Sequence, residues 1–204
     1  IFAVIAIAIC LRLLSFWYLS SLAASNPSAE PYPVLAGDST FYAHAADDLL
    51  ATHAFQDAAG KPLRAWPPGY PALLAAVKAV TGDIAFVIVL QILLSSLAIA
   101  LLFKMSRTFV PMPYALVPPL IYALDPMIIF TDTSILTDGL FTALIVCIVY
   151  LAFFQLRLRG AFQWGLVGVL VGIATMVRPI AEFLVLVFPT LFFLRDRMVG
   201  RRED

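Results

Sequence analysis

Carboxylates that can do acid–base chemistry gather in short polar segments between long apolar runs of the sequence. A carboxylate can take a proton from an acceptor hydroxyl as a general base, or it can cap the N-terminus of a helix. Local sequence leaves both roles open for Asp38, and Asp138 can be an N-cap in its "TDG" turn. Asp132 and Asp138 can bind an acceptor, a metal ion or the cation Arg178. Asp125, directly before a proline, is expected to be structural.

Three cations, Arg64, Arg178 and Lys61, are candidates for binding a phosphate group. The planar guanidinium of arginine presents paired donors that match phosphate oxygens. Arg178 lies at the end of an apolar run, where a charge next to the bilayer is costly and usually functional. Its alternative partner is Glu182, four residues further on. Lys61 can also be a solvated loop charge.

Metal chemistry has little support in the sequence. His44 and His53 are nine residues apart, and no Cys/His cluster has the spacing of zinc ligands. Cys10 and Cys147 lie in apolar runs and are read as small hydrophobic side chains. A cofactor is therefore unknown; Asp38 and His44 are the candidates if a divalent metal binds.

The composition indicates that these polar groups are held by a membrane protein. Of the 204 residues, 62% are hydrophobic and 13% are charged, whereas a soluble domain is about half apolar and about a quarter charged. The formal net charge of +0 argues against nucleic acid as a partner. We expect one transmembrane domain over residues 1–204, surrounded by membrane lipids.

The fold class predicted from the apolar runs is an all-α polytopic membrane protein. A helix needs about 20 mostly apolar residues to cross a bilayer. The third span is expected to be kinked by Pro118, Pro119 and Pro126. Arg12 is expected to pair within the bundle or to mark a shorter first span. The six predicted spans are at about residues 1–24, 84–104, 113–130, 136–156, 161–178 and 180–195.

Basic residues set the predicted orientation, because cytoplasmic loops are enriched in Lys and Arg. They follow the second, fourth and sixth spans, so the acidic loops that alternate with them are predicted to be extracytoplasmic. The basic residues in question are Lys104, Arg107, Arg157, Arg159, Arg195, Arg197, Arg201 and Arg202.

The first external loop, residues 25–83, is long enough to contain elements of its own. Two juxtamembrane helices are predicted in it, at about 39–52 and 71–82, separated by the chain-breaking string "AWPPGYP". Both are expected to lie at the membrane interface, with Tyr42, Trp66 and Tyr70 among the interfacial aromatic residues.

This loop resembles the first external loop of the GT-C glycosyltransferases, most closely the group of protein O-mannosyltransferases and lipid A aminoarabinose transferases. The shared features are an Asp at the start of a loop helix, a Tyr four residues later, Pro-Pro-x-Tyr-Pro, and a short helix ending at Gly. The strings "ALDPMIIFTDTSILTDGLF" and "GVLVGIATMVRP" resemble later segments of the family in the same order. The chain thus resembles a GT-C N-terminal module.

The resemblance implies transfer of a sugar from a polyprenyl-phosphate-linked donor to a lipid, glycan or protein acceptor outside the cytoplasm. It implies a bacterial inner membrane with the active face toward the periplasm or exterior. Asp38 is implied as the catalytic base or a metal-associated acid; Ser39 stands where many relatives have a second acid. The candidates for substrate contacts are Tyr42, Trp66, Tyr70, Asp132, Asp138 and Glu182.

Two other functions compete with the enzyme. A noncatalytic membrane subunit with this fold would not need Asp38. A transporter of lipid-linked substrates would often show inverted repeats and charges near the bilayer midplane. No convincing repeat is present, and the acidic residues cluster at one predicted face.

Overall fold

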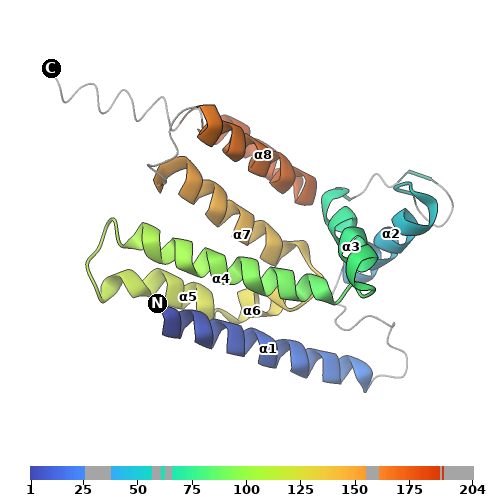
Figure 1. The fold of residues 1–204 in the computed structure, drawn as a ribbon, viewed down its shortest axis with the longest axis horizontal. Coiled ribbons are helices and arrows are strands. Elements are labelled where there is room, and N and C mark those ends of the chain that lie inside the picture. Colours follow the sequence, from blue (N-terminus) through green and yellow to red (C-terminus); the bar gives the residue numbers. More distant parts are fainter. Residues whose placement is uncertain (26–37, 57–60, 63–65, 155–160, 189, 191–204) are drawn as a thin grey trace.

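The computed structural model describes residues 1–25, 38–56, 61, 62, 66–154, 161–188 and 190. These residues are helical apart from turns and a single bridge between Gln56 and Pro62. Figure 1 shows a bundle of long helices with two shorter helices at one end. The main helices are α1 (Phe2–Ala24), α2 (Ser39–Thr52), α3 (Gly69–Thr81), α4 (Phe86–Ser106), α5 (Val117–Leu124), α6 (Pro126–Asp132), α7 (Thr137–Val149) and α8 (Ala161–Val177).

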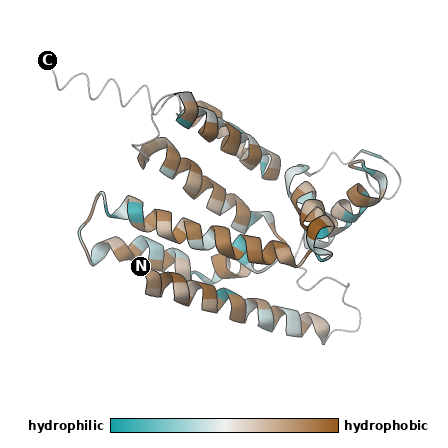
Figure 2. Ribbon diagram, in the orientation of Figure 1, coloured by the Kyte–Doolittle hydropathy of each residue, from teal (hydrophilic) through white to brown (hydrophobic). Residues whose placement is uncertain are grey.

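Three described helices are long and apolar enough to cross a membrane: α1, α4, and α7 with the π-helical turn Tyr150–Phe154 that extends it. A fourth crossing results if the bent pair Tyr114–Leu124 and Pro126–Asp132 counts as one span. Figure 2 shows that these elements are largely hydrophobic along their length. The prediction of an all-α membrane protein is confirmed.

The last two predicted spans correspond to shorter apolar helices. Phe162–Val177 and Pro179–Phe188 are each below the length of a full crossing in the described part of the chain. The chain reverses at Arg178, because Ala181 and Phe188 pack in one cluster with Val171 and Ala174 of α8. The count of six spans stays a prediction.

The third predicted span is broken rather than smoothly kinked. Its two halves meet at 55° at Asp125, whose backbone is extended and whose carboxylate caps α6 by accepting from the amides of Met127 (2.8 Å) and Ile128 (3.1 Å). Pro118 and Pro119 were expected to kink the helix and do not, because they lie in its first turn, where no backbone donor is needed. Asp125 is structural, as predicted.

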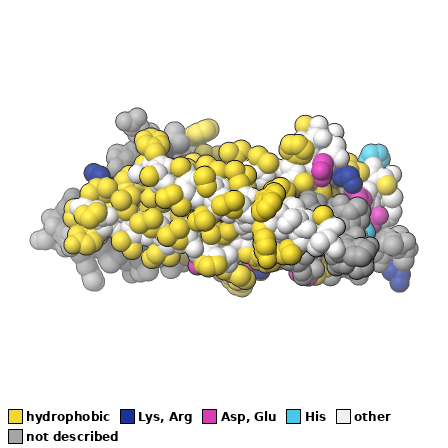
Figure 3. Space-filling model, turned by 90° about the horizontal axis from the view of Figure 1, so that it is seen from below, with side chains coloured by type: hydrophobic (Ala, Val, Ile, Leu, Met, Phe, Trp, Pro, Cys, Tyr) yellow, Lys and Arg dark blue, Asp and Glu magenta, His cyan; other side chains and the backbone are white. Residues whose placement is uncertain are grey.

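The two short helices of the 25–83 segment form one end of the molecule and pack on the bundle through a shared core. Tyr42 and Ala46 of α2 and Leu74 of α3 meet Ile88 of α4 in this core, together with Ile135. Figure 3 shows hydrophobic side chains along one face of the bundle and charged and histidine side chains at the α2–α3 end. The position of these helices at a membrane interface stays a prediction.

Candidate functional site

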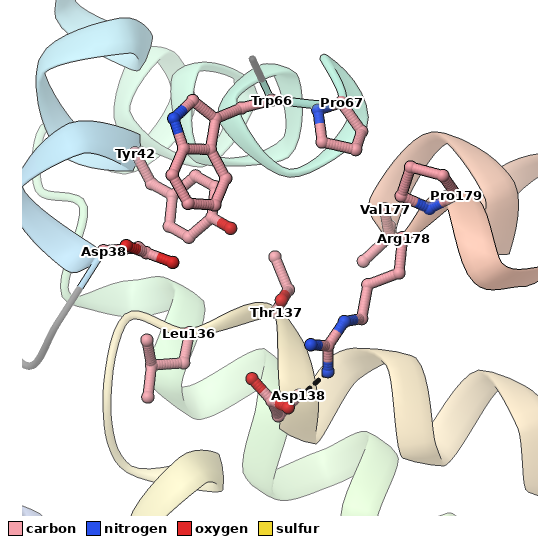
Figure 4. Close-up of a pocket in the computed structure, with 10 residues that line it drawn as sticks. All are labelled: Asp38, Tyr42, Trp66, Pro67, Leu136, Thr137, Asp138, Val177, Arg178 and Pro179. Carbon is pink, nitrogen blue, oxygen red and sulfur yellow. Dashed lines mark hydrogen bonds and ion pairs between the residues drawn. The ribbon is translucent and has the colours of Figure 1, made fainter.

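A cavity of about 260 Å³ lies where α2, the segment before α3, the start of α7 and the end of α8 meet. Figure 4 shows Asp38 and Tyr42 on one side, Arg178 on the other, and Thr137 and Asp138 at the start of α7. These residues come from three separate stretches of sequence. The fold therefore brings a carboxylate, a guanidinium, a phenol and a hydroxyl to one cavity.

Asp38 is exposed and stands at the N-cap position of α2, yet its side chain makes no capping hydrogen bond. Of the two roles left open by the sequence, capping is not the one that the side chain performs here. In Figure 4 the carboxylate points toward the interior of the cavity. No backbone amide in the first turn of α2 therefore occupies the oxygens of this carboxylate.

Aromatic side chains build one wall of the cavity. The ring of Tyr42 meets Trp66 edge-on at 5.6 Å and Tyr70 at 5.2 Å between centroids. Phe41 lies 5.2 Å from Trp66 on the far side. Edge-to-face contacts at these distances are favourable, so the contacts with Trp66 and Tyr70 orient the ring of Tyr42.

The phenol of Tyr42 remains protonated at ordinary pH. Burial raises the pKa of Tyr42; a hydrogen bond with Thr137 lowers it, and the charge of Asp38 raises it again. A neutral phenol can donate a hydrogen bond to an oxygen in the cavity. Tyr42 is thus suited to hold a substrate hydroxyl or phosphate oxygen.

Arg178 forms an ion pair with Asp138 across the start of α7 and the end of α8. Its guanidinium also lies over the ring of Phe141, 5.7 Å from the centroid. Pairing with Arg178 was one of the roles open to Asp138; the N-cap reading was wrong, because Leu136 is the N-cap residue of α7. The alternative Arg178–Glu182 pair is not formed among the described residues, because extended backbone at Arg178 separates it from the following helix.

The pair is partly open, with 41% of the Arg178 side chain and 43% of the Asp138 side chain exposed. One nitrogen, Nη1, binds Asp138. Guanidinium has five donors in a plane, so this contact orients Arg178 while leaving donors that can face the cavity.

Four candidate residues do not line the cavity. Tyr70 is fully buried behind Tyr42, and its hydroxyl bonds to Gln91. Asp132 is also fully buried and pairs with Arg12. Glu182 and Lys61 are exposed and lie away from it.

Two further candidates are His44 and Arg64. His44 is exposed on α2, and no group of three or more His, Cys, Asp or Glu side chains gathers to hold a metal ion within the described ranges. Arg64 lies outside the described residues.

Thr137 is a cavity residue that the sequence reasoning missed. A threonine before "DG" has no distinguishing pattern, and only its place next to Asp138 could have indicated it. Arg12, by contrast, was singled out for pairing within the bundle, and it does so.

Comparison with known proteins places the chain among enzymes. A family described as dolichyl-phosphate-mannose-protein mannosyltransferase matches residues 65–202. The matched stretch includes Trp66, Thr137, Asp138 and Arg178, and begins after Asp38 and Tyr42. No curated protein and no solved structure matches the chain. Because the family match covers more than half of the sequence, the chain belongs to this family of GT-C membrane glycosyltransferases.

Proposed function

We propose that the protein transfers a sugar from a polyprenyl-phosphate-linked donor to an acceptor hydroxyl, with Asp38 as the general base. The observation that supports this most is the cavity that Asp38 and Arg178 line together. Glycosyl transfer from a lipid phosphate needs a base for the acceptor proton and a cation for the leaving phosphate. Asp38 and Arg178 supply one of each.

In the proposed reaction, the acceptor oxygen attacks the anomeric carbon of the sugar while the bond from that carbon to the phosphate oxygen breaks. The acceptor proton passes to the carboxylate of Asp38. Arg178, oriented by Asp138, binds the phosphate as its negative charge increases, and Tyr42 and Thr137 donate hydrogen bonds to oxygens in the cavity. Trp66 offers an apolar face for the sugar ring.

The proposed face of the membrane is the extracytoplasmic one. Lys104 and Arg107 lie at the end of α4 that is opposite the cavity, and 21 helical residues span about 30 Å. The positive-inside rule then directs the cavity outward, which is the periplasmic side in a bacterial inner membrane. The family description, which names dolichyl phosphate mannose, favours a polyprenyl-phosphate-linked hexose as donor.

The direct test compares Asp38→Asn with Asp48→Asn, a change on the same helix at a residue outside the cavity. Purified protein in lipid nanodiscs receives dolichyl phosphate mannose, with a membrane extract as the acceptor source. Release of dolichyl phosphate is measured. Loss of a general base lowers the rate by about 10²–10⁴-fold, and Asp48→Asn should leave it unchanged.

The competing functions give other results. A noncatalytic subunit releases no dolichyl phosphate above background, and a transporter moves the intact donor across sealed vesicles without releasing it. Equal rates for Asp38→Asn and the unaltered protein would refute the role of Asp38 as the base.

A further inference from the structure

A buried ion pair joins α1 to α6. Arg12 Nε lies 2.8 Å from Asp132 Oδ2, and both side chains are fully buried. The same oxygen accepts a hydrogen bond from Ser95 of α4 at 2.7 Å. Arg12 also donates to the carbonyl of Ala123 at the end of α5, at 3.2 Å. One guanidinium therefore ties the two halves of the broken third span to α1.

A second buried side chain, Gln91 of α4, continues this network toward the cavity. Its amide nitrogen donates to the carbonyls of Asp132 and Ser134, each at 3.0 Å. Its amide oxygen accepts from the hydroxyl of Tyr70 at 2.7 Å. Gln91 thus links the connection between α6 and α7 to helix α3.

Both partners of Gln91, the α6–α7 connection and Tyr70, adjoin the cavity wall. The connection that Gln91 holds leads directly into Thr137 and Asp138. Tyr70, at the other end, packs edge-on against Tyr42. The connection between Thr133 and Leu136 is not helical, so its place is set by such side-chain contacts and not by a backbone ladder.

Stability alone explains the ion pair poorly. Replacing a buried ion pair by well-packed apolar residues is often neutral or stabilising, because two charges must be desolvated. The geometry that the pair imposes is a better explanation.

We propose that Gln91 and the Arg12–Asp132 pair are positioning residues, which fix Thr137 and Asp138 on one side of the cavity relative to Tyr42 on the other. This inference rests on the proposed function of the cavity. None of the three side chains lines the cavity, so they act through the segments they hold.

The test uses two matched variants, Gln91→Met and Gln163→Met. Gln163 of α8 is also buried, and its amide also donates to a backbone carbonyl, that of Leu151, at the far end of α8 from Arg178. Misplacing a reacting group by about 1 Å can lower the rate on the order of 10²-fold. Gln91→Met should lower kcat for dolichyl phosphate mannose by roughly 10- to 100-fold, while Gln163→Met retains it at a similar thermal midpoint.

The double variant Arg12→Met/Asp132→Leu provides the second measurement. It should keep or raise the thermal midpoint and lower kcat as Gln91→Met does. Folded variants with the kcat of the unaltered protein would overturn the proposal. Loss of folded protein in Gln91→Met and in the double variant would assign the network to folding alone and would also overturn it.

The fluorescence emission of Trp66, a measurement that does not depend on catalysis, separates this inference from the proposed function. In a Trp17→Phe/Trp164→Phe background, Trp66 is the single indole and reports on the cavity wall. Gln91→Met should red-shift its emission and Gln163→Met should not. If the unaltered protein releases no dolichyl phosphate, the proposed function fails, while an unshifted Trp66 emission in Gln91→Met refutes the positioning role by itself.

Discussion

Gly69 of α3 lies directly against the backbone of Met176 in α8, and a methyl group there should disable the enzyme. A Cβ at this position would lie 2.5 Å from the carbonyl oxygen of Met176 and 2.7 Å from its carbon. Carbon and oxygen normally approach to about 3.3–3.6 Å. The Gly69→Ala variant therefore requires the two helices to separate by about 1 Å, and backbone atoms cannot rotate away as a side chain could.

The separation should reach the cavity because Met176 lies two residues before Arg178. Overpacking of this size costs about 1–3 kcal/mol of folding stability. A shift of about 1 Å in Arg178, which we propose binds the leaving phosphate, lowers the rate on the order of 10²-fold. We expect both effects in Gly69→Ala: a lower thermal midpoint and a lower kcat/KM for dolichyl phosphate mannose.

Gly168→Ala on α8 is the matched control, since a Cβ there meets nothing within 4 Å. Alanine in place of glycine within a helix is favourable by roughly 0.5–1 kcal/mol, so this variant should be as active as the unaltered protein and at least as stable. The assay is dolichyl phosphate release in nanodiscs, with thermal unfolding measured in parallel. A Gly69→Ala protein that matches the Gly168→Ala protein in rate and midpoint would refute the reasoning.

Three further outcomes follow from the site. Arg178→Lys keeps the charge but loses the planar fork, and should raise the donor KM roughly 10- to 100-fold in steady-state kinetics; an unchanged KM would argue against phosphate binding by Arg178. Gly139→Ala brings a methyl into steric overlap with Asp132 Oδ1 and should lower the free energy of unfolding by about 1–3 kcal/mol, measured by thermal unfolding in detergent. Burial raises the pKa of Tyr70 well above its ordinary value of 10.0. The contribution of the neutral phenol to folding stability is therefore complete below pH 10 and falls as the pH rises toward the folded-state pKa. In a pH series above pH 10, the Tyr70→Phe variant should lose less folding stability than the unaltered protein.

The helices were predictable because length and hydropathy are local properties of the sequence. The apolar runs at about 1–24, 84–104 and 136–156 each contain a long helix in the structure. The break at Asp125 was harder to predict from the sequence, because a proline begins a helix as readily as it kinks one. The neighbouring helices decide whether a given proline begins a helix or kinks it.

The cavity was only partly predictable, because it depends on contacts between distant residues. Asp38 was identified through the resemblance of its loop to the family, and Arg178 from its position at the end of an apolar run. Asp132 was mistaken for a candidate ligand because the partner that neutralises it, Arg12, is 120 residues away. Tyr70 was assigned to the substrate because a tyrosine beside prolines gives no indication of which face it turns to the core.

The Arg12–Asp132 pair also has a consequence for biosynthesis. A ribosome adds about 5–20 residues per second, so the 120 residues between the partners take roughly 6–24 s to synthesise. During that interval α1 holds an unpaired arginine, which opposes insertion by roughly 2.5–3.5 kcal/mol at a helix centre. Helix α1 is therefore expected to stay near the translocon until α6 emerges, and the bundle to close around α1 only then.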